Sequence, residues 1–483
     1  LVLYNKYIGK VRAIIPPLSM VQENKGNLVT GGDALAEEFL SIPMETDGKH
    51  NTLQEVIDDK NIAIIGFENP PYSSELARAQ EGNIKSKDKY SYIRKLMSDE
   101  FTGDSSHAKD LLNQFVWSFE KYFMRNEHDY YILFAPVKYW KSVGLMKKTF
   151  VDGFLANRGN FKAQESSVLV AQWKNEVDTI TESLTVPAKE IWKDDKKWGT
   201  GKGAAVIDVP EDAILKDVKH VTIRKVYKTL GEYYSKKVKA DVLSKIATGY
   251  DGREVPLKSY GKPVYNDNIL AVIEASGFGT TPQDIRMTRI AIYHGRGSQV
   301  RTTNYAEQTA LFVAKQYPQR NWYERDIYYT TADKGDLYKK DINFLRKSTL
   351  WTCISQKNHC LSFHGSDGKF YNNEMCLDEN SLVRKELVEQ EKYGKLDRAD
   401  LMLLGVFDEL LELVKDTQEY NPEYNYGTYQ IELEINTSYK DSNDKKIFNN
   451  EKVNTKLKEL KKRLAEYYEN ELESKLFEYE LLK

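Results

Sequence analysis

Short apolar runs alternate with amphipathic stretches in the first part of the chain. Runs rich in β-branched and aromatic residues lie at 62–66, 129–135 and 167–173, and each has the length and composition of a buried strand. Between the first two runs, apolar side chains recur at three- and four-residue spacing, which predicts an amphipathic helix. These side chains are Leu111, Leu112, Phe115, Phe119, Tyr122 and Phe123. With a further helix expected over 138–150 and a turn over 153–161, the alternation is typical of a doubly wound α/β domain.

The pattern changes near residue 179 and again near residue 376. The middle stretch mixes short apolar runs with clusters of lysine and arginine, and the last stretch holds two long charged segments, 382–417 and 453–482, of helical character. The second segment carries an apolar stripe on one predicted face. Its members are Val453, Leu457, Leu460, Leu464 and Tyr467. We therefore expect three regions, at 1–178, 179–375 and 376–483.

Composition limits the class of protein. The 483 residues are 41% hydrophobic and 29% charged with a formal net charge of -2, which favours a globular chain and excludes a uniformly basic nucleic-acid binder. Three cysteines argue against a disulfide framework and suit a reducing cytoplasm. Because Cys353, Cys360 and Cys376, with two nearby histidines, lack the paired spacing of a zinc site, no metal is expected. No apolar run is long enough to span a membrane.

The run at 62–66 leads into the stretch with the most distinctive chemistry, Asn69-Pro70-Pro71-Tyr72. Two successive prolines end a strand abruptly and leave a rigid loop at its carboxyl end, where open α/β sheets bind ligands. The Asn69 side chain and the Pro70 carbonyl are hydrogen-bond acceptors, and Tyr72 offers a ring for stacking. Two acceptors aimed at one planar NH2 group would localise its lone pair and make it nucleophilic.

The tetrapeptide resembles the catalytic motif of S-adenosylmethionine-dependent amino-methyltransferases, above all those that methylate the exocyclic amine of adenine in DNA. The resemblance implies a Rossmann-like methyltransferase core, the cofactor S-adenosyl-L-methionine, catalytic roles for Asn69, Pro70, Pro71 and Tyr72, and stacking of the target base on Tyr72. The alternative is a plain Pro-Pro turn, but a chance Asn-Pro-Pro-aromatic in a chain this long is on the order of one in a few hundred.

Two other positions gain a role from this resemblance. Asp33 follows a short strand expected at 27–30 and two glycines, and it resembles the family's acidic residue that hydrogen-bonds the cofactor adenine. Phe161 precedes a late strand and resembles the second aromatic that packs on the extruded base. The alternatives are an Asp33 that caps the next helix and a Phe161 that belongs to the core.

The glycine-rich cofactor loop that the resemblance implies does not appear before Asp33. Only 32 residues precede Asp33 and the chain begins with Leu1, so we expect the core to be incomplete at its N-terminus. A circularly permuted order, with the loop at 199–203, is the alternative. The strand before it would be 189–193, which is polar for a buried parallel strand.

Clusters of lysine and arginine downstream of the motif predict contacts with DNA. Phosphate binding needs local patches of positive charge, and base reading needs arginine on a rigid support. A solvated helix face is the common alternative for each cluster taken alone. The candidate DNA-binding residues are Lys219, Arg224, Lys225, Lys228, Arg286, Arg289, Arg296 and Arg301.

These observations predict a site-specific DNA methyltransferase that acts on adenine N6 in double-stranded DNA with a flipped target base. We expect a catalytic core at 1–178, a target-recognition region at 179–375 and a helical C-terminal region, with a restriction or specificity subunit or a fused nuclease as partner. Such a protein would be cytoplasmic and associated with the nucleoid. The alternatives are a non-catalytic fragment that binds DNA or a partner, and a protein glutamine methyltransferase, whose compact form fits the long downstream region poorly.

Overall fold

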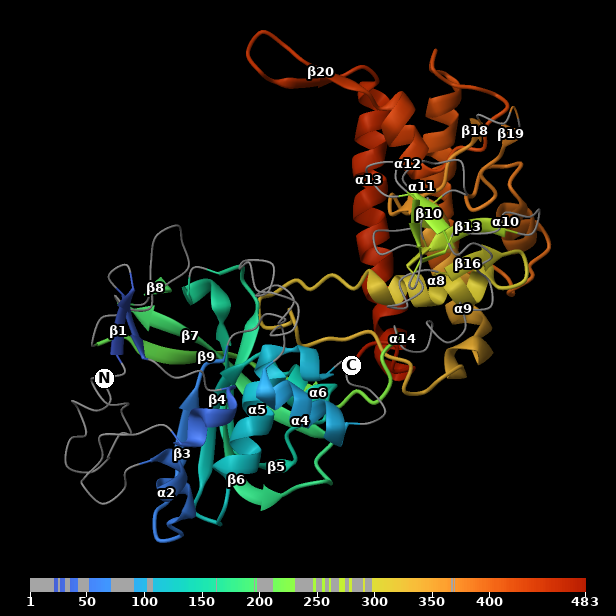
Figure 1. The fold of residues 1–483 in the computed structure, drawn as a ribbon. Coiled ribbons are helices and arrows are strands. Elements are labelled where there is room, and N and C mark those ends of the chain that lie inside the picture. The colour runs from blue at the N-terminus through green and yellow to red at the C-terminus, as the bar shows by residue number, and fades with distance from the viewer. Residues whose placement is uncertain are drawn as a thin grey trace. The chain divides into compact units, whose positions relative to one another are not determined.

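The computed structural model describes residues 35–41, 52–70, 91–101, 107–161, 163–194, 212–230, 301–365, 368 and 370–483, with short strands between 21 and 30, at 196–197 and between 246 and 300 (Figure 1). The chain forms two compact units. The first holds residues 1–225 and the segment Gln319–Tyr328, and the second holds Val226–Pro318 and Tyr329–Lys483. The functional regions expected at 1–178, 179–375 and 376–483 stay predictions.

A seven-stranded sheet is the centre of the first unit (Figure 1). Its strands are β3 (Ile65–Glu68), β4 (Tyr130–Ala135), β5 (Lys148–Asn157), β6 (Ser167–Val177), β7 (Ser183–Lys193), β8 (Lys196–Lys197) and β9 (Ile214–Arg224). They lie in the order β3-β4-β6-β5-β7-β8, and β9 pairs with β7. β3 runs parallel to β4, and β5 runs parallel to β7, whereas β6 is antiparallel to both β4 and β5. The expected α/β class is therefore shown, with a mixed sheet in place of a purely parallel one.

The strands expected at 129–135 and 167–173 are confirmed, but two predictions between them are wrong. The helix expected over 138–150 ends early, because α6 covers only Lys138–Lys141. The turn expected over 153–161 is mostly strand, since β5 extends to Asn157 and pairs with β6 along its length. Residues such as Thr149 and Val151 are β-branched, and pairing with a neighbouring strand overrides the weak helical spacing of the segment.

Helices cover one face of this sheet. They are α2 (Leu53–Asp58), α4 (Tyr92–Glu100), α5 (Leu111–Tyr122) and α6, with 3-10 turns η2 (Glu37–Ser41), η3 (His107–Lys109) and η4 (Arg158–Phe161). α5 confirms the predicted amphipathic helix, and it begins where the Asp110 side chain accepts from the Leu112 amide. It buries Leu112, Val116 and Phe119 in the same core as β4.

The other face of β3 is open to solvent. Ile65 is 65% exposed and Phe67 is 64% exposed, while the alternate residues Ile64 and Gly66 are buried. The expectation that the whole apolar run is buried is therefore wrong. β3 lies at the edge of the described sheet and has one covered face, so its side chains alternate between core and solvent.

The strand expected at 27–30 is confirmed as β2 (Asn27–Thr30), but it pairs antiparallel with β1 (Val21–Asn24) in a separate two-stranded sheet. β2 is therefore not a strand of the seven-stranded sheet that contains β3. Two strands close in sequence can form a hairpin without a crossover helix, and here this local pairing replaces the long-range one.

The second unit is mainly helical, and its longest helices pack side by side. Its helices are α8 (Tyr305–Lys315), η8 (Leu337–Lys340), α9 (Ile342–Ile354), α10 (Leu382–Arg384), η9 (Lys385–Glu389), α11 (Arg398–Lys415), α12 (Thr428–Gln430), η10 (Ile431–Ile435), α13 (Glu451–Tyr467), η11 (Tyr468–Leu472) and α14 (Glu473–Glu478). The predicted stripe on α13 is buried, and α13 packs on α11 within the same unit. The charged segments at 382–417 and 453–482 are thus mainly helical as expected, with a break between η9 and α11.

Short strands complete the second unit. They are β10 (Ile246–Thr248), β11 (Glu254–Pro256), β12 (Tyr260–Gly261), β13 (Ile269–Ile273), β14 (Phe278–Gly279), β15 (Ile290–Ala291), β16 (Ser298–Arg301), β17 (Asn358–His359), β18 (Phe363–His364), β19 (Phe370–Tyr371), β20 (Ser438–Lys440) and β21 (Lys446–Phe448). They form small sheets of two strands and one sheet of four.

Candidate functional site

The candidate site begins at the carboxyl end of β3. Residues 65–68 pair in parallel with 130–133 of β4, and the strand ends at Glu68. Asn69 follows directly and is exposed, whereas Pro70 is buried. A proline at this point cannot donate to a ladder, so the chain must leave the sheet here. Pro71 and Tyr72 lie outside the described residues.

Gly66 fixes how β3 lies under α5. A Cβ atom on Gly66 would lie 2.0 Å from Cζ of Phe119, so glycine is the residue that this contact admits. The Phe119 ring stacks on Tyr131 of β4 with their centroids 4.0 Å apart. The absence of a side chain at Gly66 therefore makes room for an aromatic stack that joins α5 to β4.

A partly buried carboxyl and a fully buried phenol meet beside the motif. The Tyr131 hydroxyl donates to Oε2 of Glu68 at 2.5 Å, and Tyr131 has no exposed surface. Burial raises the pKa of Glu68 to about 7, and the hydrogen bond from Tyr131 opposes part of this rise. Burial and the neighbouring Glu68 also raise the pKa of Tyr131, so the phenol keeps its proton.

The amino end of β3 is held by a second polar cluster. Asp129, fully buried before β4, accepts from the amides of Ile64 at 2.7 Å and Asn126 at 2.8 Å. The Arg125 guanidinium pairs with Asp129 and donates to the Ile62 carbonyl at 2.7 Å. Burial alone would raise the pKa of Asp129, but the hydrogen bonds from Arg125, Ile64 and Asn126 hold it below its usual value. Together with the ladder to β4, this cluster fixes the position of β3.

The other residues of the proposed catalytic core are not all placed. Asp33 lies outside the described residues. Phe161 is the last residue of η4, between β5 and β6, and its side chain is outside the described part of the chain. The roles of Asp33 in cofactor binding and of Phe161 in base stacking therefore stay predictions.

The first four candidate DNA-binding residues are all described, and they belong to both units. Lys219 and Arg224 are exposed on β9, five positions apart, so their side chains leave opposite faces of the strand. Lys225 lies over the Trp140 ring, with its Nζ 5.1 Å from the centroid. Lys228 belongs to the second unit, where its amide donates to Asp333 at 2.6 Å.

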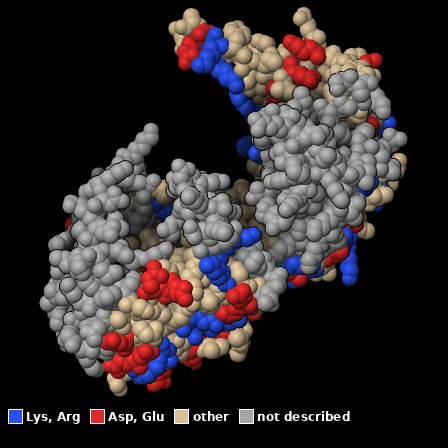
Figure 2. Space-filling view, viewed as in Figure 1, with Lys and Arg blue, Asp and Glu red and all other residues tan. Residues whose placement is uncertain are grey.

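Of the four arginines expected to read bases, Arg301 alone is placed. It ends β16, and its amide donates to the Asn304 side chain at 2.7 Å. Arg286, Arg289 and Arg296 lie outside the described residues. On the face shown in Figure 2, the described lysine and arginine side chains are interspersed with aspartate and glutamate. A DNA-binding role for these residues stays a prediction.

The aromatic segment at 319–328 packs on the first unit. Trp322 is buried and donates from its indole nitrogen to Glu190 of β7 at 2.7 Å. The Arg325 carbonyl accepts from the hydroxyl of Ser167 at 2.6 Å, at the start of β6. These contacts give the segment a structural role, because each one ties it to the sheet.

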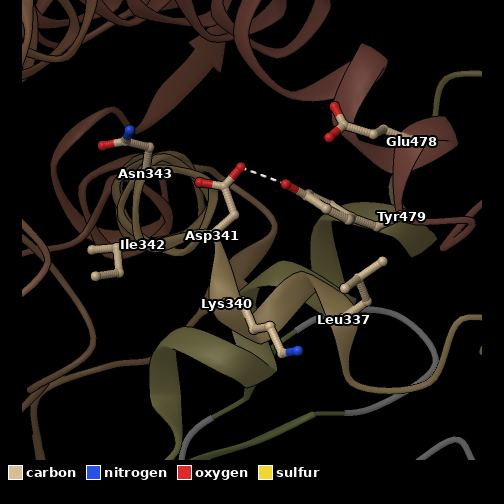
Figure 3. A pocket seen from close by; sticks show the side chains of 7 residues that line it. All are labelled: Leu337, Lys340, Asp341, Ile342, Asn343, Glu478 and Tyr479. Carbon is tan, nitrogen blue, oxygen red and sulfur yellow. Dashed lines mark hydrogen bonds between the residues drawn. The ribbon is translucent and has the colours of Figure 1, made fainter.

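Asp341, at the N-terminus of α9, lines two pockets of the second unit. One, of about 560 Å³, is lined by Leu337, Lys340, Asp341, Ile342, Asn343, Glu478 and Tyr479 (Figure 3). Its central polar contact joins the Tyr479 hydroxyl to Asp341 at 2.6 Å, and the other carboxylate oxygen of Asp341 caps α9. Both oxygens of the Asp341 carboxylate therefore make structural hydrogen bonds.

The cysteines lie in the core of the second unit. Cys353, Cys360 and Cys376 are buried, and burial raises the pKa of each thiol. Within the described ranges, no group of three histidine, cysteine or carboxylate side chains is arranged to hold a metal ion. A buried, protonated thiol is chemically inert, so these cysteines act as core residues.

Sequence reasoning missed the residues that support the motif. Glu68 stands next to Asn69, but its contact is with the hydroxyl of Tyr131, 63 positions away. The one available signal was the alternation of β4, which places Tyr131 and Leu133 on the same face. The Asp129 cluster depends likewise on contacts across more than 60 positions.

Comparison with protein-family models, with curated proteins and with solved structures found no match for this chain. In the part of the chain that the structure describes, no helix has the length and apolar character needed to cross a membrane.

Proposed function

We propose that the chain is the catalytic part of an S-adenosylmethionine-dependent DNA methyltransferase that acts on the exocyclic amine of adenine. The observation that carries this proposal is the position of Asn69-Pro70-Pro71-Tyr72, which begins directly after the last residue of parallel strand β3. Ligands of α/β sheets bind at the carboxyl ends of parallel strands. The motif therefore stands where a substrate could reach it.

Each residue of the motif would make a different contact with the target adenine. The side-chain oxygen of Asn69 and the carbonyl of Pro70 would accept the two hydrogens of the NH2 group, which localises the nitrogen lone pair. Extruding the adenine costs a few kcal/mol, and stacking on Tyr72 would recover about 1 to 3 kcal/mol of this. Positioning of the amine for in-line attack supplies most of the rate enhancement.

The described residues fit the amine better than the cofactor. The carboxyl ends of β3 and β4 offer Glu68, Asn69 and Pro70 on one side and Pro136 on the other, and none of the glycine-rich turns of the sequence lies there among the described residues. When bound, S-adenosyl-L-methionine supplies a methyl group on a positively charged sulfur. Asp33 is the candidate to hold its adenine, through the carboxylate.

The DNA would be held by local basic surfaces, and the exposed Lys219 and Arg224 on β9 are two of the described candidates. A restriction or specificity subunit, or a fused nuclease, would use the methylation state of the same site. Such a protein would associate with the nucleoid.

The test is methyl transfer by the complete protein with Asn69→Ala. Because the change removes one acceptor for the amine, we expect labelled methyl transfer to adenine-containing duplexes to fall below detection while duplex affinity stays within about twofold. Asn61→Ala is the matched control, since Asn61 is an exposed asparagine in the turn before β3.

Two results would contradict the proposal. Unchanged turnover in Asn69→Ala would remove the motif from the chemistry. Methyl transfer to a glutamine-containing peptide, with none to DNA, would show that the motif is catalytic but that the substrate is a protein glutamine.

A further inference from the structure

Resting on the proposed function, we propose that Glu68 and Tyr131 are positioning residues for the amine-binding loop, because the hydrogen bond between them fixes the end of β3 from which Asn69 and Pro70 continue. Neither residue need touch the substrate. Their role would be to hold the Asn69 side chain and the Pro70 carbonyl in the geometry that the reaction requires.

β3 needs such support at its end. The strand has four residues, pairs with β4 on one side, and is the last strand of the described sheet on its other side. Pro70, two positions after Glu68, cannot add a ladder hydrogen bond. The end of the strand therefore depends on side-chain contacts, and Glu68 supplies one of them, a single peptide bond from Asn69.

Tyr131 is a rigid anchor for this contact. It is fully buried on β4, two positions before Leu133, the residue that pairs with Glu68. Its ring stacks on Phe119, and Phe119 stacks in turn on Phe123 with centroids 5.0 Å apart. A hydroxyl on a ring packed in this way has little freedom, so it fixes the Glu68 carboxyl and the backbone that carries it.

The strength of this contact depends on the charge of Glu68. An ionised carboxylate accepts a stronger hydrogen bond than a neutral one, and a pKa of about 7 populates both forms near neutral pH. Tyr131 of β4 is the titratable side chain that acts on Glu68, and Tyr139 of α6 acts on Tyr131. Phe119, which packs from α5, carries no charge. The positioning should therefore strengthen as pH rises through about 7.

Methyl transfer requires a proton to leave the substrate. When bound, S-adenosyl-L-methionine would supply the methyl group and keep the electron pair of the carbon–sulfur bond on sulfur, and the substrate nitrogen that accepts the methyl group would lose a proton to solvent. Glu68 takes no part in these steps. A pH dependence that follows Glu68 would therefore report on positioning.

The first experiment measures methyl transfer by the complete protein between pH 6 and pH 8. If the ionised form alone positions the loop, kcat should rise about tenfold over this range in the wild type, since the ionised fraction rises from about 0.09 to about 0.91. Glu68→Gln keeps an acceptor for Tyr131 but cannot titrate, so its profile should be flat. Tyr131→Phe should lower kcat on the order of tenfold with KM for the cofactor unchanged.

Two matched controls separate positioning from stability. Glu120→Gln removes another carboxyl whose pKa is raised by burial, on α5, and Tyr305→Phe removes the hydroxyl of another fully buried tyrosine, which donates to Glu386 of η9 at 2.7 Å. Both should keep the wild-type pH profile. Wild-type kcat and pH profile in Glu68→Gln and in Tyr131→Phe would overturn the proposal.

A second experiment needs no methyl transfer, and it distinguishes failure of this inference from failure of the proposed function. In protein labelled with 15N-asparagine, the Asn69 side-chain amide signal, assigned by its loss in Asn69→Ala, should shift with pH in step with the 13C signal of the Glu68 carboxyl. The shift should disappear in Glu68→Gln. An Asn69 signal that ignores the titration of Glu68 would overturn the inference, whatever reaction the protein catalyses.

Discussion

Gly66→Ala should destabilise the first unit, although alanine suits a strand better than glycine. The new Cβ atom would lie 2.0 Å from Cζ of Phe119, and ordinary contact begins at 3.4 Å, so the ring must withdraw by about 1.4 Å or β3 must move away from α5. Overpacking of this kind costs about 1 to 3 kcal/mol. Disturbing the stack of Phe119 on Tyr131 adds about 0.5 to 1.5 kcal/mol. We therefore expect the free energy of unfolding to fall by about 2 to 4 kcal/mol.

The assay is urea unfolding followed by tryptophan fluorescence, since Trp117, Trp140 and Trp173 lie in the core of the first unit. Gly405→Ala on α11 is the control, because a Cβ there meets no atom within 4 Å and alanine should stabilise the helix by about 0.5 to 1 kcal/mol. Phe119→Leu in the Gly66→Ala background should recover part of the loss. A Gly66→Ala protein as stable as the wild type would refute the contact between β3 and α5.

Two further predictions concern other parts of the chain. Asp400 is fully buried, pairs with Arg346 at 2.7 Å and accepts a hydrogen bond from the Tyr467 hydroxyl at 2.5 Å. Asp400→Ala should therefore lower the free energy of unfolding by about 3 to 5 kcal/mol, measured by thermal or urea unfolding. A loss below about 1 kcal/mol would contradict this prediction. If β9 contacts DNA phosphates, reversing the charge of a contacting residue should reduce the slope of log affinity against log salt by about 1. Because Lys219 and Arg224 lie on opposite faces of β9, we expect this change in only one of the two variants. Unchanged slopes for both would remove β9 from the DNA interface.

Local patterns predicted the elements whose signal lies within one segment. The helix over 111–122 has an unbroken apolar spacing, and the strands of 130–135 and 167–177 have dense apolar runs. The apolar stripe on α13 was likewise predicted from its spacing, and its residues are buried where α13 packs on α11. In each case the pattern needs no distant partner to be recognised.

The failures share a cause, which is pairing that the local pattern does not encode. β5 extends from Lys148 to Asn157 because β6 pairs with it, although the segment carries weak helical spacing. β2 pairs with β1 and stays out of the main sheet. Glu68 has the sequence character of a surface residue, and its contact with Tyr131 follows from the register of β3 on β4. The contact of Glu68 with Tyr131 spans 63 positions, so a single sequence does not show it.

The register of β3 decides which groups the candidate site can offer. Side chains of a strand alternate between its two faces, so a slip of one residue would turn Asn69 toward the core and Glu68 toward solvent. Gly66 opposes that slip, because the position under Phe119 admits no side chain, and Ile65 or Phe67 would have to enter it. The glycine thus places Glu68 beside Tyr131 and leaves Asn69 exposed. A residue without functional groups thereby sets the chemistry at the end of the strand.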